Sequence, residues 1–289
     1  MFVRRSVRDL LPGDHAWLPF GCPDEQAHVI GSWITQGLRI RDKVIYVTDA
    51  DHWELPGLYG HDLRPAVRAG LLTLIPTGDA CLTGGLFDPD KLLDTLADEI
   101  AKAEEQEFRG IRVTTEVSWA LSQPFGDSRL DLCEREFGER VCPSVSVTAI
   151  CQTDLRHCSP EQFDLLDAHH EVRVVPDPDF DDPVLSITRT YQPPGLRLRG
   201  ELDAARHTHF AEALNSLRSG GGGDGAETVH LDLSELDFLS LGALRTMVDY
   251  TRRRGSGSSV VLHRVAPDVR STLEVVGMHR LPGIRLDED

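Results

Sequence analysis

Three stretches in the last third of the chain decide its fold: LRLRGELDAARHTHFAEAL (196–214), HLDLSELDFLSLGALRTMVDYTRRRG (230–255) and VVLHRVAPDVRSTLEVVGMHRLPGIRL (260–286). Each joins a short apolar run to an amphipathic stretch, which predicts strands that alternate with helices. None of the three contains a complete catalytic motif. The pattern therefore predicts a small α/β domain at this end of the chain.

The order of these segments resembles the STAS domain of anti-anti-sigma factors, over residues 185–289. LSITRTY (185–191) and GLRLRGELD (195–203) correspond to its first strands, and HLDLSELDFLS (230–240) to its central strand and the following loop. The resemblance implies that a partner kinase, which is also the anti-sigma factor, phosphorylates a hydroxyl in that loop. The phosphate adds negative charge at a helix start and blocks docking.

The loop departs from the family pattern at the phosphorylated position. The usual Asp-Ser-Ser/Thr-Gly-Leu is replaced by SLGAL (240–244), so Leu241 and Gly242 occupy the two hydroxyl positions. Ser240 is then either the N-cap of the next helix or a displaced phosphorylation site, and both alternatives stay open. We predict control without the usual serine phosphorylation. The expected partner-binding surface consists of Leu239, Ser240, Leu241, Gly242, Leu244 and Arg245.

The first 175 residues alternate apolar runs with helical patterns. The runs are HAWLPF (15–20), KVIYVTD (43–49), LLTLIPT (71–77), GIRVTTEVSW (110–119) and SVTAICQTD (146–154). They are apolar nearly throughout, which is typical of parallel strands whose sheet is covered on both faces. The spacing predicts βαβ units and a three-layer α/β domain.

Two stretches lack a pattern of their own. The acidic, proline-containing PDPDFDDP (176–183) cannot bury enough apolar surface to fold alone, so we expect a linker at 176–184 between domains 1–175 and 185–289. The glycine-rich SGGGGDG (219–225) is expected to be a surface loop inside the second domain.

A ligand crevice is expected at the carboxyl ends of the parallel strands. The predicted strands and their ends supply an imidazole, a carboxylate, an amide and two indoles, which suit the polar contacts and walls of a small-molecule site. Alternatively, the tryptophans belong to the core, the carboxylate caps a helix or pairs with an arginine, and the histidine is bonded in a turn. The candidate ligand residues are His15, Trp17, Glu116, Trp119 and Gln152.

GDHAWLPF (13–20), QGLRIRDKVIYVTDAD (36–51), GGLFDPDKL (84–92), RGIRVTTEVSWAL (109–121) and TAICQTD (148–154) together resemble the MEDS domain, over roughly residues 10–172. The resemblance implies a sensory relative of RecA- and KaiC-type ATPases that binds a small molecule. Yet PFGCPDEQAH (19–28) replaces the phosphate-binding GxxxxGK[ST] motif. It has no lysine, and its two carboxylates would repel a triphosphate, so we predict no P-loop and no ATP hydrolysis.

Composition excludes several classes of function. The net charge of −17 lies almost entirely in residues 1–182, which argues against nucleic-acid binding. No apolar run is long enough to span a membrane and the start lacks a secretion signal, so we expect a cytoplasmic protein. Cys151 and Cys158 with His157, His169 and His170 form an imaginable metal site. Buried reduced thiols and surface histidines are the favoured interpretation, and we expect no metal and no cofactor.

These observations predict a bacterial signal-transduction regulator rather than an enzyme. Its first domain would sense a small molecule or another signal. Its STAS domain would bind an anti-sigma factor or a histidine-kinase-like switch protein, and so control sigma-factor-dependent transcription by partner switching. The first alternative is a STAS-based scaffold subunit of a signalling complex, and the second is a residual nucleotide-binding or hydrolytic enzyme. A homodimer is compatible with each of these functions.

Overall fold

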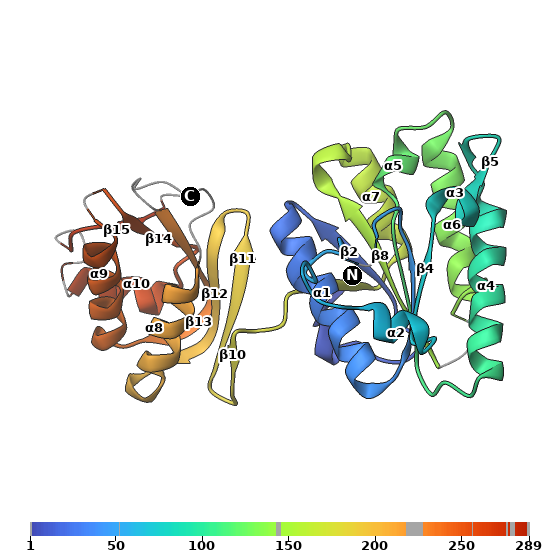
Figure 1. The fold of residues 1–289 in the computed structure, drawn as a ribbon. Helices are drawn as coiled ribbons and strands as arrows, with labels where there is room; N and C mark the ends of the chain where they lie inside the picture. The colour runs from blue at the N-terminus through green and yellow to red at the C-terminus, as the bar shows by residue number, and fades with distance from the viewer. Residues whose placement is uncertain are drawn as a thin grey trace. The chain divides into compact units, whose positions relative to one another are not determined.

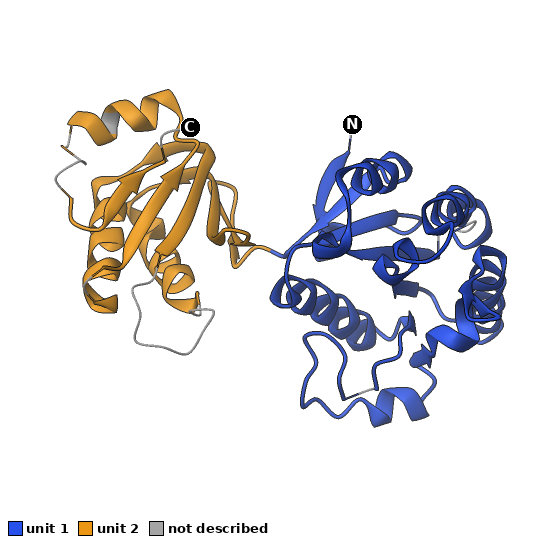
Figure 2. Cartoon of the chain, turned by 90° about the horizontal axis from the view of Figure 1, so that it is seen from above, with its two compact units in different colours: residues 1–177 blue, residues 178–289 orange. Residues whose placement is uncertain are grey.

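The computed structural model describes residues 2–51, 53–142, 146–217, 228–255, 257–275, 277 and 281–287. The chain divides into two compact units, residues 1–177 and residues 178–289, which Figure 2 colours blue and orange. The predicted glycine-rich loop at 219–225 lies outside the described residues. Each unit has its own apolar core, as expected for a separate domain.

The first unit is built on a seven-stranded sheet in the order β1-β9-β2-β8-β7-β3-β4, and all its pairs are parallel. Five of these strands are the predicted apolar runs. The two others, β1 and β9, were not predicted. The strands are β1 (Val3–Ser6), β2 (His15–Phe20), β3 (Lys43–Val47), β4 (Leu72–Ile75), β7 (Ile111–Glu116), β8 (Val147–Asp154) and β9 (Val172–Val175).

Helices cover both faces of this sheet (Figure 1). Helix α1 (Pro23–Ile40) packs on one face, against side chains such as Ala16 and Leu18 of β2. Successive side chains of a strand point to opposite faces, so Trp17 joins the other core, with α4 (Pro89–Glu105), α6 (Gly126–Arg140) and α7 (Pro160–His169). The prediction of a three-layer parallel-sheet α/β domain is confirmed.

Short elements complete the first unit. They are η1 (Val7–Asp9), α2 (Arg64–Arg68), α3 (Thr77–Cys81), the hairpin of β5 (Leu82–Thr83) and β6 (Leu86–Phe87), α5 (Ser118–Leu121) and η2 (Leu155–His157). Side chains cap the starts of α4 and α7. Asp88 Oδ1 accepts the Lys91 amide at the start of α4, and Ser159 and Gln162 form a capping box at the start of α7.

The second unit has a six-stranded mixed sheet in the order β10-β11-β12-β13-β14-β15. The first two pairs are antiparallel and the remaining three are parallel. One apolar core joins the sheet to the three helices, which confirms the prediction of a smaller α/β domain. Its elements are β10 (Phe180–Asp181), β11 (Leu185–Tyr191), β12 (Pro194–Leu202), η3 (Ala204–Arg206), α8 (His207–Ser216), β13 (Thr228–Leu239), α9 (Leu241–Arg254), β14 (Ser259–His263), α10 (Pro267–Val275) and β15 (Ile284–Leu286).

The segment 176–184, expected to be a linker, is partly built into the two units. The Asp177 carboxylate accepts hydrogen bonds from Ser32 and Gln36 of α1, each at 2.9 Å. Phe180 and Asp181 form β10, which pairs with β11. Asp177, whose acidic character suggested a linker, therefore serves as a hydrogen-bond acceptor for α1.

Candidate functional site

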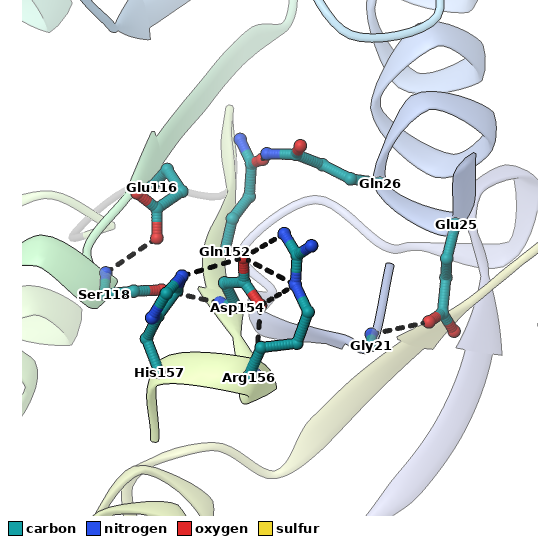
Figure 3. Close-up of polar contacts among 9 residues, drawn as sticks. All are labelled: Gly21, Glu25, Gln26, Glu116, Ser118, Gln152, Asp154, Arg156 and His157. Carbon is teal, nitrogen blue, oxygen red and sulfur yellow. Dashed lines mark hydrogen bonds and ion pairs between the residues drawn. The ribbon is translucent and has the colours of Figure 1, made fainter. Parts of the chain in front are cut away.

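A pocket of about 490 Å³ opens at the carboxyl ends of β2, β7 and β8, the edge at which ligands bind in open parallel sheets. Six elements contribute to its wall, because the ends of these three strands lie beside α1 and the short helices α5 and η2. Figure 3 shows most of its polar residues together with Gly21, Glu25 and Gln152. The lining residues are Phe20, Gln26, Glu116, Ser118, Trp119, Ser122, Asp154, Arg156 and His157.

Glu116 ends β7 and is held by the turn that follows it. Its Oε1 accepts the backbone amide of Ser118 at 2.7 Å, and its carbonyl oxygen accepts the indole N–H of Trp119 at 3.0 Å. Burial raises the pKa of Glu116, and the hydrogen bonds from Ser118 oppose that rise. Glu116 therefore keeps its proton to higher pH than an ordinary glutamate carboxyl group does.

Asp154 ends β8 and has the opposite tendency. Arg156 binds its carboxylate with two nitrogens, Nε at 2.9 Å from Oδ1 and Nη2 at 2.5 Å from Oδ2. These hydrogen bonds from Arg156 lower the pKa of Asp154, while its burial opposes the change. The pocket thus contains one carboxyl group whose pKa is raised by burial and one whose pKa is lowered by the arginine beside it.

Gln152 lies beneath the pocket rather than on its wall. Its side chain is fully buried, and its Nε2 donates to Thr114 Oγ1 at 2.8 Å and to the Tyr46 hydroxyl at 3.2 Å. Its Oε1 accepts a hydrogen bond from Gln26 at 2.8 Å, and Gln26 does line the pocket. Gln152 therefore supports the pocket through Gln26.

The structure does not bring His15 and Trp17 to this pocket, so the expected convergence of all five candidates is wrong for these two. His15 is the first residue of β2, at the amino end of the strand. Trp17 is fully buried in the core, where its indole donates to Thr153 Oγ1 at 2.9 Å. Both belong to the strand that leads into the crevice, but the crevice opens at its far end.

The loop between β2 and α1 differs from a phosphate-binding loop in two respects. Its Gly21 amide donates to Glu25 Oε2 at 2.9 Å, so a carboxylate of the chain takes the amide that a phosphate-binding loop would offer. Pro23, at the first turn of α1, supplies no N–H. The observed contacts agree with the sequence, which lacks the P-loop lysine in this segment.

The expected partner surface separates into exposed and buried residues. Leu241 is 62% exposed, and the Arg245 side chain is 86% exposed. Phe238, at the end of β13, is 48% exposed and adjoins them in sequence, although it was not among the expected residues. Leu239 and Leu244 are core residues, which corrects their expected role as direct contacts. We call Phe238, Leu241 and Arg245 the α9 surface.

Ser240 caps the start of α9. Its Oγ accepts the Ala243 amide at 3.3 Å and lies 2.5 Å from His207 Nε2. Gly242 lies against the same histidine, and a Cβ built there would be 1.9 Å from His207 Cε1. The hydroxyl of Ser240 thus already has two hydrogen-bond partners, the Ala243 amide and the His207 imidazole.

Four potential metal ligands come together elsewhere in the first unit: His15, Glu134, Cys151 and His170. Cys151 and His170 belong to the group considered from the sequence. His157 instead faces the pocket, and His169 is hydrogen-bonded to Asp131 at 2.9 Å. His170 is buried, so the expectation of surface histidines is wrong for this residue. Because the four residues come from four different elements, no local spacing in the sequence could reveal them.

Comparisons with known proteins agree with this architecture. Residues 14–171 match the family described as MEDS, the methanogen/methylotroph, DcmR sensory domain, and residues 185–285 match the family described as Mlab, STAS domain. No curated protein matches the chain. Within the described residues, no helix combines the length and apolar character needed to cross a membrane.

Two solved structures are similar to the chain at low identity. A KaiC-like protein from Pyrococcus horikoshii OT3 is 15% identical, with a TM-score of 0.43, over 65% of this chain and 80% of that one. The flagellar accessory protein FlaH from Methanocaldococcus jannaschii is 9% identical, with a TM-score of 0.38, over 63% of this chain and 80% of that one.

Proposed function

Because the chain belongs to the MEDS sensory-domain family and carries a STAS domain after it, we propose that it is a regulator that senses a small molecule and passes the signal to a protein partner. A sensory domain joined to a STAS domain indicates a signalling or regulatory role. The finer proposal is that the partner is an anti-sigma factor or a histidine-kinase-like switch protein, through which the chain controls sigma-factor-dependent transcription.

One observation carries the sensory part of the proposal. A pocket of about 490 Å³ lies at the ligand-binding edge of the sheet, while the Gly21 amide beside it is already bonded to Glu25. The pocket therefore suits a small ligand without phosphate groups. Trp119 and Phe20 supply apolar walls, and Glu116 supplies a carboxyl group that can donate or accept a hydrogen bond.

The partner part rests on the α9 surface. Phe238 and Leu241 are large apolar side chains left exposed beside the helix start, and Arg245 adds a cation on the same helix. Aromatic residues and arginine are enriched at protein interfaces. Since the usual hydroxyl positions hold Leu241 and Gly242, we propose that occupancy of the pocket, rather than phosphorylation, controls partner binding.

The experiment is affinity capture with the full-length chain from a lysate of its source organism, followed by mass spectrometry. The bait is compared with Leu241→Glu and with a matched control, Val275→Glu. The control also replaces an exposed apolar side chain by glutamate, at a site on α10 that is 88% exposed. We expect a kinase-fold switch protein that is retained by the wild type and the control and lost by Leu241→Glu. A stoichiometric partner without a kinase fold would instead support the scaffold alternative.

A further inference from the structure

Four side chains from four elements direct donor atoms to one point inside the first unit. His15 begins β2, Glu134 lies in α6, Cys151 lies in β8, and His170 follows α7. Glu134 Oε2 lies 3.2 Å from His15 Nε2, 3.4 Å from His170 Nε2 and 3.6 Å from Cys151 Sγ. His15 Nε2 is also 3.2 Å from Cys151 Sγ, and all four donor atoms lie within 4.8 Å of one another.

The hydrogen bonding of His170 fixes which of its ring nitrogens is available. Nδ1 lies 2.7 Å from the carbonyl oxygen of Leu166, and a carbonyl can only accept, so Nδ1 carries the proton. In the neutral ring, Nε2 therefore points a lone pair into the cluster. This atom is fully buried and has no hydrogen-bond partner in the described part of the chain. A ring nitrogen held by a backbone carbonyl in this way is the usual arrangement of a metal-binding histidine.

When His170 is neutral and Glu134 is ionised, a cluster without a cation brings two hydrogen-bond acceptors together. The lone pair of His170 faces the carboxylate of Glu134, and two acceptors at this distance repel each other unless a proton or a metal lies between them. Glu134 and Cys151 are buried as well, with 4% and 2% of their surfaces exposed. A buried carboxylate is costly unless it is paired with positive charge or binds a metal.

We propose that His15, Glu134, Cys151 and His170 bind a zinc ion. Zinc prefers four ligands in a tetrahedron drawn from imidazole nitrogen, thiolate sulfur and carboxylate oxygen. Ligand bonds of about 2.0–2.3 Å place neighbouring donor atoms about 3.3–3.8 Å apart in a tetrahedron. The four separations given above, from 3.2 to 3.6 Å, are close to that spacing. This inference revises the expectation of no metal site.

Charge and protons balance in this site. The thiol of Cys151 loses one proton to solvent when the ion binds, while both histidines bind as neutral rings and Glu134 as a carboxylate. One thiolate and one carboxylate then neutralise the two charges of Zn²⁺. In the absence of an ion, burial and the nearby Glu134 raise the pKa of the Cys151 thiol well above its usual range. Binding is therefore accompanied by proton release, as for other cysteine-containing zinc sites.

The surroundings indicate a structural role rather than a catalytic one. Four protein ligands fill the tetrahedron, so no position remains for a water molecule to be activated. The Phe137 ring stacks on His15 with centroids 4.4 Å apart and forms part of an apolar shell. The His15 side chain is 12% exposed, which makes it the most accessible of the four ligands. The ion would join β2, β8, α6 and the end of α7.

The first test uses the wild-type full-length chain and needs no variant. The protein is treated with a chelator, dialysed and titrated with Zn²⁺ against a chromophoric competitor, and its bound zinc is measured by mass spectrometry. We expect one zinc per chain and a higher melting temperature with Zn²⁺. Replacement by Co²⁺ should give the intense visible absorption of a tetrahedral site and a thiolate-to-cobalt charge-transfer band. Substoichiometric zinc, or cobalt spectra without that band, would overturn the proposal.

Matched variants then assign the site. Cys151→Ser and His170→Gln should each weaken zinc binding by at least about 100-fold, since even the loss of an outer-shell partner costs 10–100-fold. The controls are Cys158→Ser and His169→Gln, which remove the same chemical groups outside the cluster and should retain wild-type affinity. Equal affinity of Cys151→Ser and Cys158→Ser would contradict the assignment. The outcome is independent of the proposed signalling partner.

Discussion

The imidazole of His207 occupies the space that a side chain at Gly242 would need. A Cβ at position 242 would lie 1.9 Å from His207 Cε1, and the same ring lies 2.5 Å from Ser240 Oγ. The lack of a hydroxyl residue at position 242 is therefore linked to the packing of a histidine from α8.

Restoring a hydroxyl by Gly242→Ser should destabilise the second unit by about 1–3 kcal/mol, because the His207 ring must move away from an overpacked site. Thermal unfolding of the full-length chain measures the change, and peptide-resolved hydrogen exchange over 230–254 assigns it to this unit. The double variant with His207→Ala should recover part of the loss. Additive losses in the double variant would show that the two positions are not coupled.

Ser240→Ala should destabilise the start of α9 by about 1 kcal/mol, because the Ala243 amide loses its cap. Ser240→Asp should cost much less, since aspartate is an equally good N-cap and its charge suits the helix N-terminus. The same unfolding measurement compares the two. Equal losses would mean that the contact with His207, rather than the cap, makes Ser240 important.

The full-length chain should show no saturable binding of MgATP by isothermal titration calorimetry, even at millimolar nucleotide. The Gly21 amide is occupied by Glu25, and the segment 19–28 offers no lysine to a phosphate group. Glu25→Gln removes the negative charge and still leaves the lysine missing, so it should not gain binding. Saturable binding by the wild type would revive the nucleotide-binding alternative.

Glu116→Gln should become progressively more stable than the wild type as pH rises above 4.5, the ordinary value for a glutamate carboxyl. Burial raises the pKa of Glu116 in the folded chain, with a smaller contribution from Asp154 and opposition from His157. The folded state then binds this proton more tightly than the unfolded state, so the wild type loses stability as pH rises through the folded pKa. Urea unfolding at several pH values gives the difference. Glu139→Gln, at an exposed site on α6, is the matched control for the same change of side chain.

The sequence predicts five strands of the first sheet, including the edge strand β4, and misses β1 and its neighbour β9. The runs that became β2, β3, β4, β7 and β8 are apolar because both of their faces are covered. β1 reads VRRS and β9 reads VRVV, so arginines interrupt the apolar run in both strands. Local propensity is a weak guide for such strands, because their pairing depends on residues far away in the sequence.

The residues of the candidate site also divide into those that the sequence predicts and those that it does not. Glu116 and Trp119 follow a strand end, and the strand-end rule brings them to the pocket. Arg156 and His157 lie in η2, one turn beyond the predicted strand, and were missed. Glu134 could not be found from its own helix, since its importance depends on how α6 packs beside β8 and α7.

The pairing of β1 with β9 also constrains how the protein is made. β1 lies at the edge of the sheet, and its partner strand begins at Val172, more than 160 residues later in the chain. At synthesis rates of about 5–20 residues per second, residues 3–6 wait roughly ten to thirty seconds for that partner to be translated. β1 therefore lacks its partner strand until nearly all of the first unit has been translated.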